Sequence, residues 1–534
     1  MEVAKMKKKL TLSICLALLL TLFMGMQASA ATTMTIVSCQ IVGGNVVVTA
    51  AGTPTPSDDG NYYLFALQPY ETAIGNRVDF CAVAPQAATM QMATTLDLNT
   101  PASKLYARFQ IAVKTGGKYV SVSNDFYITN PEAVATTVTA PIPHATKKGI
   151  TMDWRHFTDV ADLGCGYALY ELNLSHFYEA GGFPYAYNGK QYNFNLMAVA
   201  EYDAICTMAA QCNANLIMAV KNTYNPATLD LIYPTARKAG YNGYAFNISE
   251  QGSAEKIEAL MHFLAERYSN IGVGTIQSWI IGNEVNNNRP WHYAGNRNVT
   301  EFSQMYANEF RLCYNAIKSA NAGAKVYINL DQRWLWEDGT PNQYGGKKVL
   351  NTFNATIATT GNIDWGLSFH PHSVPLTNCK FWTIPGSYRS LNLISHDENT
   401  KMINPMNISV LTTYMAKPEF LNPAGGPRSI IISEMLFTSS NRSYATNETV
   451  QAAAMTYGYK LMAAQPLIEA VIIHRDIDDA YEIQQGMACG LRNANGTPKL
   501  AYEAFKYMDQ PGSANSNFAL GVIGASSWAQ LGLQ

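Results

Sequence analysis

The pattern of hydrophobic positions changes character along the chain. Within residues 31–131, short segments with alternating or β-branched residues are separated by Gly, Pro, Asn and Asp, which is typical of antiparallel strands. From Gly149 onward, apolar runs alternate with segments of helical periodicity, which indicates βα units around a parallel sheet. The pattern therefore predicts a small all-β sandwich over 31–131, a Pro-containing linker over 132–148 and an α/β domain over 149–511.

The α/β part contains eight candidate strands, each followed by a connection long enough for a helix. Eight such units predict a (β/α)8 TIM barrel. An open doubly wound sheet is the alternative, but no strand is followed by the Gly-rich phosphate loop of its nucleotide-binding versions. The candidate strands are 149–154, 167–174, 214–220, 276–283, 325–330, 364–369, 429–433 and 467–474. The clearest helices are 196–211, 253–268 with Ser253 as N-cap, 299–320 and 448–464. Residues 512–534 are expected to form an irregular C-terminal tail that either docks on the barrel or stays mobile.

The first 30 residues have the organisation of a secretory signal peptide. Four lysines precede an apolar segment over residues 10–26, and Ala28-Ser29-Ala30 fits a cleavage site. The apolar segment is short for a membrane span, although a retained anchor is the alternative. We therefore expect cleavage after Ala30, secretion of the mature chain and no membrane insertion after cleavage.

Charge and composition narrow the class of ligand. Loss of the signal peptide removes four Lys and one Glu, so the formal net charge of −2 becomes −5. A negative net charge does not provide the excess of basic residues that nucleic-acid binding requires. Only 14% of residues are charged, and the abundant Tyr and amide side chains suit an uncharged hydroxylated ligand such as a sugar.

Eight cysteines remain in the mature chain. Cys39 and Cys81 are the only pair in the N-terminal region, so they form its most plausible disulfide, with buried free thiols as the alternative. No pair of cysteines has zinc-finger spacing.

Two glutamates follow candidate barrel strands. Glu284 ends the fourth strand and Glu434 ends the seventh. The carboxyl ends of barrel strands form the active face, and two carboxylates there can cleave a glycosidic bond. The alternative for each is a structural ion pair with Arg or Lys.

These residues also carry a family resemblance. Asn283-Glu284, Ser433-Glu434 and the segment 496–506 resemble the corresponding parts of clan A glycoside hydrolases, a group of retaining TIM-barrel glycosidases. The resemblance covers about residues 149–510 and points to a secreted bacterial branch outside the characterised families. It implies Glu434 as nucleophile, Glu284 as acid/base, Asn283 as partner of the sugar 2-hydroxyl, and no cofactor. Retention requires carboxyl groups about 5–5.5 Å apart, and their repulsion would help keep one of them protonated.

Further strand ends supply candidate substrate-binding groups. Clan members often have a Tyr where this chain has His372, and a Trp near its eighth strand end, where it has none. Arg475 could bind a charged sugar, but an internal pair with Asp476, Asp478 or Asp479 is favoured. Metal binding by the two histidines of the sixth strand lacks a third ligand at suitable spacing, so no metal is predicted. The candidate substrate-binding residues are Asp153, Glu171, Asn173, Asn222, Asn283, Trp334, His370, His372 and Arg475.

The sequence therefore predicts a secreted retaining glycoside hydrolase acting on a poly- or oligosaccharide by double displacement. A non-catalytic carbohydrate-binding barrel is the main alternative, supported by the missing Trp. A cell-surface structural protein is a third, although internal repeats and a low-complexity stalk are absent from the sequence. The sequence also lacks a GxSxG elbow, a P-loop and an HExxH motif.

Overall fold

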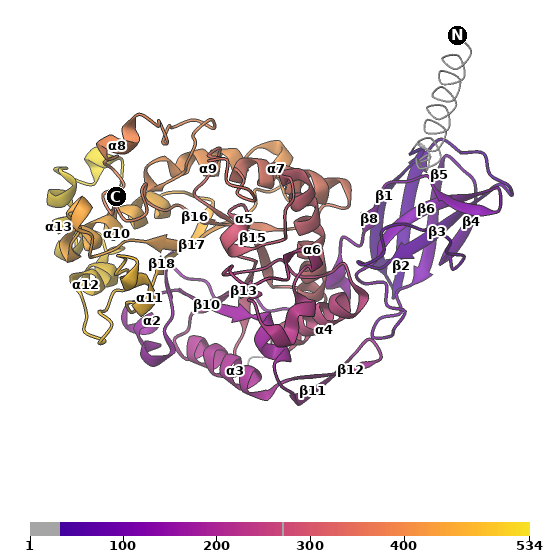
Figure 1. The fold of residues 1–534 in the computed structure, drawn as a ribbon, viewed down its shortest axis with the longest axis horizontal. Helices are drawn as coiled ribbons and strands as arrows, with labels where there is room; N and C mark the ends of the chain where they lie inside the picture. The colour runs from indigo at the N-terminus through magenta and orange to yellow at the C-terminus, as the bar shows by residue number, and fades with distance from the viewer. Residues whose placement is uncertain (1–31, 270–271, 534) are drawn as a thin grey trace, which may run out of the picture.

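A closed barrel of eight parallel strands forms the centre of the protein (Figure 1). The computed structural model describes residues 32–269 and 272–533, so the predicted signal peptide lies outside the described residues. Consecutive strands are neighbours, and β18 pairs with β9 to close the barrel, which confirms the predicted barrel and excludes the open sheet. The strands are β9 (Lys148–Thr151), β10 (Tyr167–Asn173), β13 (Asn215–Lys221), β14 (Ile276–Ile281), β15 (Lys325–Asp331), β16 (Gly366–His370), β17 (Ile430–Leu436) and β18 (Ile468–His474).

Helices surround the barrel, as Figure 1 shows. Their long members are α3 (Leu196–Gln211), α4 (Gln251–Arg267), α6 (Val299–Ala320), α7 (Gly346–Thr359), α9 (Ile408–Met415), α10 (Glu448–Ala463), α12 (Leu500–Tyr507) and α13 (Ala514–Ile523). Short helical turns are α2 (Asp159–Asp162), α5 (Asn288–Trp291), α8 (Gly386–Arg389) and α11 (Ala480–Gln484). The predicted cap at Ser253 is wrong, because Glu250 has the extended backbone of an N-cap and Ser253 is buried in the first turn.

The interior of the barrel is apolar along most of the strands and polar at their carboxyl ends, which form the barrel mouth. Leu169, Ile217, Ile280 and Ile472 belong to one buried cluster contributed by alternate strand positions. The strands lose this apolar character at their carboxyl ends, where polar side chains such as Glu171 take over. The architecture thus collects the strand-end groups in one place.

An irregularity in β17 adds a second polar group to this mouth. Ile432 pairs with Val471 and Met435 pairs with Ile473, so Ser433 and Glu434 together occupy the space opposite one residue of β18. Such a bulge redirects side chains that strict alternation would send to opposite faces. Ser433 and Glu434 consequently both face the cavity at the barrel mouth.

Two antiparallel sheets precede the barrel. One contains β1 (Met34–Val42), β2 (Asn45–Gly52) and β5 (Thr89–Thr95); the other contains β4 (Ala82–Pro85), β3 (Asn61–Leu67), β6 (Arg108–Thr115), β7 (Lys118–Ser121) and β8 (Phe126–Tyr127). The expected Cys39–Cys81 disulfide is not formed: both thiols are free, and that of Cys81 donates to the Leu64 carbonyl.

The N-terminal sheets pack against the side of the barrel near α4 and α6 (Figure 1). The Asn315 amide donates to the Leu105 carbonyl at 2.9 Å, and the hydroxyls of Tyr106 and Tyr187 lie 2.6 Å apart. Tyr187 belongs to a hairpin of β11 (Gly182–Tyr187) and β12 (Lys190–Asn195) that was not predicted.

Residues 132–148 connect the two parts without leaving the barrel surface. The Thr139 N–H donates to Asn321 Oδ1 at 3.1 Å, and Asn215 exchanges two hydrogen bonds of 2.8 and 2.7 Å with the main chain of Ile142. The segment is therefore fixed along its length to α6 and β13.

The C-terminal segment differs from the predicted irregular tail. Helix α13 packs against α10 and α12, and the Trp528 ring lies 6.3 Å from that of Tyr457. Small and apolar residues over 518–523 form no clear helical stripe, and the helix is stabilised by this packing.

A buried carboxyl group at the junction of sheets and barrel has a consequence for stability. Glu258 of α4 is 6% exposed beside Tyr70 and Ser103, and burial raises its pKa from 4.5 to about 8. Between these values the folded protein holds a proton that the unfolded chain has released. The free energy of unfolding should therefore fall as pH rises from about 4.5 to 8, by up to about 4 kcal/mol from this group.

Urea denaturation of wild type and Glu258→Gln at both ends of this pH range checks the prediction. The Gln side chain does not titrate, so the variant should lose less stability on the alkaline side than wild type does. Equal losses in the two proteins would show that Glu258 titrates normally.

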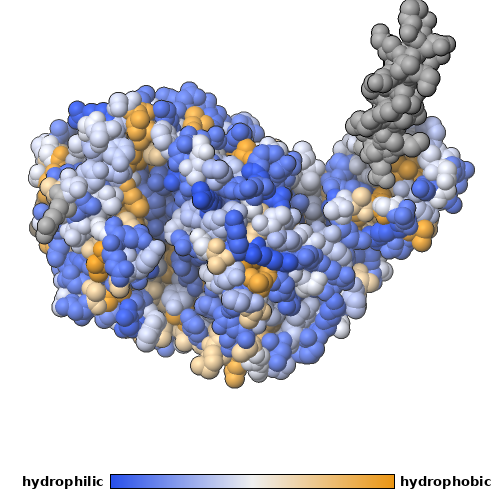
Figure 2. Space-filling view, viewed as in Figure 1, coloured by the Kyte–Doolittle hydropathy of each residue, from blue (hydrophilic) through white to orange (hydrophobic). Residues whose placement is uncertain are grey.

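Hydrophilic residues cover most of the face in Figure 2, with hydrophobic residues in small separate groups. Among the residues described, no helix combines the length and apolar character needed to cross a membrane.

Candidate active site

The two strand-end glutamates meet at the barrel mouth. Glu434 lines a small central cavity together with Asn283, His370 and Ser433. Glu284 follows β14 with φ of 40°, after Gly282 with φ of 78°, and this turn carries its side chain inward. Its carboxyl group is 7% exposed, whereas that of Glu434 is partly open.

Two histidines from the end of β16 lie between these carboxylates. His370 Nδ1 is 3.0 Å from Glu284 Oε1 and 3.9 Å from Glu434 Oε2. His372 Nε2 is 3.5 Å from Glu284 Oε1 and 3.6 Å from Glu434 Oε1. Because Glu284 Oε1 and Glu434 Oε2 both lie this close to His370 Nδ1, these two oxygens are at most about 7 Å apart.

Asn329 of β15 organises this centre. Its Oδ1 accepts the Glu284 backbone N–H, which turns its Nδ2 toward Ser368 Oγ at 2.7 Å and His370 Nε2 at 3.1 Å. An amide nitrogen donates, so the network assigns Nε2 as the acceptor and Nδ1 as the N–H that faces Glu284. Ser433 Oγ lies 2.9 Å from the same Nε2.

Electrostatics in the site favour ionised carboxylates. Burial alone would raise the pKa of Glu284, but hydrogen bonds from His370 and His372 lower it below the usual value of 4.5. Burial is likewise outweighed at Glu434, where His474, His370 and His372 lower the pKa to about 2. The pKa of His372 is raised, because its carboxylate partners outweigh its burial.

These shifts correct the expectation that repulsion keeps Glu284 protonated. The histidines compensate the repulsion between the carboxylates, so the pKa of Glu284 is lowered while that of His372 is raised. No sequence pattern shows this, because both histidines reach the carboxylates from a different strand.

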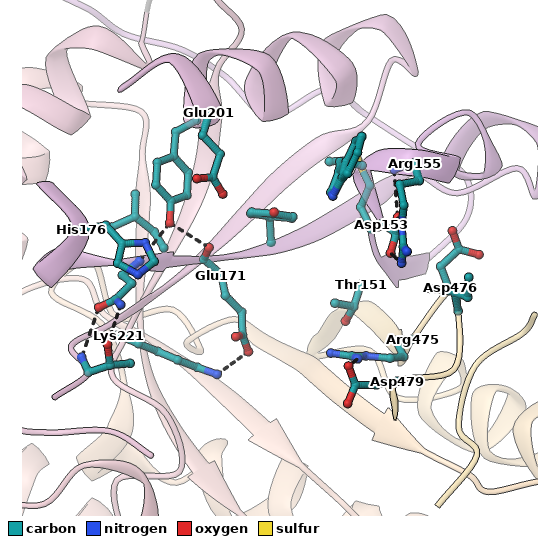
Figure 3. Close-up of a pocket in the computed structure, with 18 of the residues that line it drawn as sticks. Thr151, Asp153, Arg155, Glu171, His176, Glu201, Lys221, Arg475, Asp476 and Asp479 are labelled. Carbon is teal, nitrogen blue, oxygen red and sulfur yellow. Dashed lines mark hydrogen bonds and ion pairs between the residues drawn. The ribbon is translucent and has the colours of Figure 1, made fainter. Parts of the chain in front are cut away.

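A larger pocket opens beside the central cavity and shares Glu171 with it (Figure 3). Its volume is about 440 Å³, and its walls come from the ends of β9, β10, β13 and β18. Figure 3 shows Glu171 and Arg475 extending into it from different strands. Each is paired, Glu171 with Lys221 and Arg475 with Asp479 at 3.0 Å.

Two further predicted residues line this pocket, with their polar groups engaged. Asp153 receives Arg155 Nε and Nη2 at 2.9 and 2.6 Å. Asn173 donates to Thr223 Oγ1 at 2.6 Å and accepts the Thr223 N–H at 3.1 Å, which ties the end of β10 to that of β13. Asp153 and Asn173 therefore shape the wall.

Asn222 and Trp334 do not line either of these cavities. Asn222 is 1% exposed and donates to the Leu231 carbonyl within its loop. Trp334 is fully buried, donates to the Glu398 carbonyl and packs against Tyr414. Trp334 lies in the loop after β15, and its burial against Tyr414 of α9 leaves the ring no free face for stacking.

Trp154 instead provides an aromatic surface. It follows β9, is 58% exposed and lines the larger pocket. Its place directly after a strand end was visible in the sequence, but its exposure depends on the loops around it.

Several polar residues of the site were not singled out from the sequence. Ser368, Asn329 and Ser433 form the network behind His370, and alternation within strands with polar ends is the signal that could have found them. Asp331 is buried beside Asn286, and burial together with Glu284 raises its pKa to about 6.

Comparisons with known proteins bear on the barrel and the segments around it. The family model of DUF5722, described as a family of unknown function, matches residues 140–531. No curated protein matches the chain significantly.

The solved structures that the chain resembles include several glycoside hydrolases. A family 39 glycoside hydrolase from Bacteroides cellulosilyticus is 12% identical over 90% of this chain and 81% of its own, with a TM-score of 0.46. A family 10 endo-β-1,4-xylanase from Gloeophyllum trabeum is 12% identical over 71% and 98%, with a TM-score of 0.40. A GH5 subfamily 18 protein from Bifidobacterium longum, in complex with Manβ1-4GlcNAc, is 13% identical over 69% and 79%, with a TM-score of 0.43.

Proposed function

The chain belongs to the DUF5722 family of unknown function, and we propose that it is a retaining glycoside hydrolase. The observation that carries the hydrolase part of this proposal is the pair of carboxylates, Glu284 and Glu434, with oxygens at most about 7 Å apart at a barrel mouth that opens into a sugar-sized pocket. The retaining part rests on the resemblance of Asn283-Glu284 and Ser433-Glu434 to clan A glycoside hydrolases.

Glu434 is the nucleophile in this proposal. Its lowered pKa keeps it ionised, and its partly open carboxylate faces the cavity. It attacks the anomeric carbon, a C–O bond forms to the glutamate, and the bond to the leaving oxygen breaks. Water then cleaves the glycosyl-enzyme with net retention.

Glu284 delivers the proton that the leaving oxygen needs. In this proposal His372 supplies the proton, since its Nε2 lies 3.5 Å from Glu284 Oε1 and its pKa is raised, so the two groups act together as the acid. In the second step Glu284 takes a proton from the attacking water. The histidine pair thus keeps the proton close while both carboxylates remain charged.

The larger pocket supplies the binding surface. Asn283 reaches the same cavity as Glu434, where it can bond the sugar 2-hydroxyl. Trp154 offers an aromatic face in place of the tryptophan that the end of β18 lacks. Arg475 can bind the carboxylate of an acidic sugar if its ion pair with Asp479 opens.

We propose that the two N-terminal sheets form a sandwich that supports the barrel. Their contacts with α6 and the β11–β12 hairpin favour this role over an independent carbohydrate-binding module. Secretion with cleavage after Ala30 remains part of the proposal, and N-terminal sequencing of exported protein tests it.

Replacing Trp154 with Ala should raise KM about tenfold with little change in kcat. The ring contributes stacking to the bound sugar but does not touch the reacting atoms, and a tenfold effect corresponds to about 1.4 kcal/mol. Trp154→Phe keeps an aromatic face and should retain most of the affinity. An unchanged KM in Trp154→Ala would remove the residue from the sugar site.

The experiment that tests the function is a polysaccharide panel scored for new reducing ends. The anomeric configuration of the first product, read by NMR before mutarotation, then tests retention. A carbohydrate-binding barrel would retain a glycan of the panel without cleaving it, and inversion would contradict the double displacement.

A further inference from the structure

Three donor atoms converge at the centre of the site: His370 Nδ1 and His372 Nε2 lie 3.0 and 3.5 Å from Glu284 Oε1. Glu434 is the candidate fourth ligand, with Oε2 3.9 Å from His370 Nδ1 and Oε1 3.6 Å from His372 Nε2. The ligand atoms of Glu284, His370 and His372 all lie within 4.8 Å of one another. We propose that these residues bind one divalent transition-metal ion of the zinc class.

The spacing suits such an ion without movement of the main chain. Nitrogen and oxygen ligands lie about 2.0–2.2 Å from Zn²⁺, and in a tetrahedral site they are about 3.3 Å from each other. The distances from His370 Nδ1 to the two carboxylates are 3.0 and 3.9 Å, one shorter and one longer than about 3.3 Å. Small side-chain rotations therefore complete the coordination.

The donor chemistry selects the ion. Two imidazole nitrogens and carboxylate oxygens form a set that zinc, iron and manganese use, whereas Ca²⁺ and Mg²⁺ prefer oxygen ligands alone. The ion also supplies the positive charge that two carboxylates this close require.

A second layer of hydrogen bonds is arranged to orient one ligand. Ser433 Oγ lies 2.9 Å from His370 Nε2 and 2.5 Å from Ser368 Oγ. When Nδ1 binds the ion, the proton moves to Nε2, which donates to Ser433, while Ser433 donates to Ser368. Asn329 Nδ2, which donates to Nε2 in the free site, then directs its hydrogens to its other two partners, Ser368 and Ser433. Such partners fix the tautomer and the ring orientation of metal-bound histidines.

The proposed site departs from the sequence-based prediction of no metal. The sequence shows His370 and His372 close together, but the third ligand, Glu284, comes from a strand end far away in the sequence. Only the closure of the barrel brings β14, β16 and β17 to the same point.

One consequence rests on the proposed function. An ion bound by Glu284 and Glu434 occupies the lone pairs of both the nucleophile and the acid/base, so the metal-loaded protein should not hydrolyse glycans. Binding itself does not depend on that function.

The direct test is titration of metal-free protein with Co²⁺, which reports tetrahedral coordination through an intense visible absorption band. We expect one ion per chain, and displacement of the band by one equivalent of Zn²⁺. His372→Ala should weaken binding about 100-fold or more, and Glu434→Gln about tenfold. His396→Ala, which changes an exposed histidine outside the site, is the matched control and should bind as wild type does.

Two results would overturn the site: absence of the band in wild type, or equal affinity in wild type and His372→Ala. Thermal denaturation of each variant excludes loss of fold, and the isosteric Glu434→Gln serves as the second test if His372→Ala does not fold.

Activity separates this inference from the proposed function. Inhibition by stoichiometric Zn²⁺, reversed by a chelator, supports both. A protein that shows the Co²⁺ band but cleaves no glycan of the panel keeps the metal site and refutes the glycosidase. A chelator that abolishes cleavage keeps the metal site and refutes the double displacement.

Discussion

Glu434→Gln will lower kcat for glycan hydrolysis by about 10⁴-fold or more. The amide keeps the shape of the carboxylate but carries no charge, so it cannot attack the anomeric carbon, and without the covalent intermediate both chemical steps are lost. The larger pocket is unchanged, and the variant should still bind the glycan that wild type cleaves. Initial rates of reducing-end release measure the loss, and equilibrium binding measures what remains.

Glu503→Gln is the matched control, since it makes the same exchange on the exposed face of α12. It should have wild-type rates. Activity of Glu434→Gln near that of this control would remove Glu434 from the mechanism, provided that both variants unfold at the wild-type temperature.

The second large effect concerns the acid. Glu284→Ala should slow hydrolysis of substrates with poor leaving groups by about 10²–10⁴-fold, because no group then delivers the proton. A dinitrophenyl glycoside needs no such proton and should lose far less in its glycosylation step. Azide, which fits the space left by the side chain, should restore turnover and yield a glycosyl azide.

The measurement is kcat/KM across aryl glycosides of graded leaving-group pKa. A steep dependence in the variant and a shallow one in wild type is the expected result. Equal slopes in the two proteins, with no azide product, would assign the acid role to another group. His372 is the first candidate, because its pKa is raised and its Nε2 lies 3.5 Å from Glu284 Oε1.

The barrel could be predicted because its strands are buried on both faces. Uninterrupted apolar runs such as residues 216–220 are typical of strands inside a parallel sheet, and the runs end where polar residues face the mouth. Glu284 and Glu434 followed from that rule alone, since a carboxylate after such a strand lies on the active face of any barrel.

The rest depended on contacts between distant segments. The β11–β12 hairpin has aromatic residues at alternate positions on both sides of an Asn188-Gly189 turn, a hairpin signal that the prediction missed. Its place against α4, through contacts such as that of Tyr185 with His262, depends on the folded structure. Trp334 and Asn222 follow strand ends just as Trp154 does, and only the folding of their loops decides that the first two are covered.

The pKa shifts of the site carboxylates also could not be predicted from the sequence. A pair of carboxylates by itself predicts one raised pKa, but His370 and His372 reach both groups and reverse that expectation for Glu284. The distances that make this reversal are properties of the closed barrel and not of any one segment.

The fixed course of residues 132–148 limits how this protein can be recombined. Ancillary domains that hang on flexible linkers can be removed or exchanged without disturbing their neighbours. Here the segment after the sheets supplies main-chain partners to the buried amides of Asn215 and Asn321, and a cut within it would leave them unpaired. A chimera that exchanges the sheets must therefore keep this segment with the barrel or rebuild its contacts.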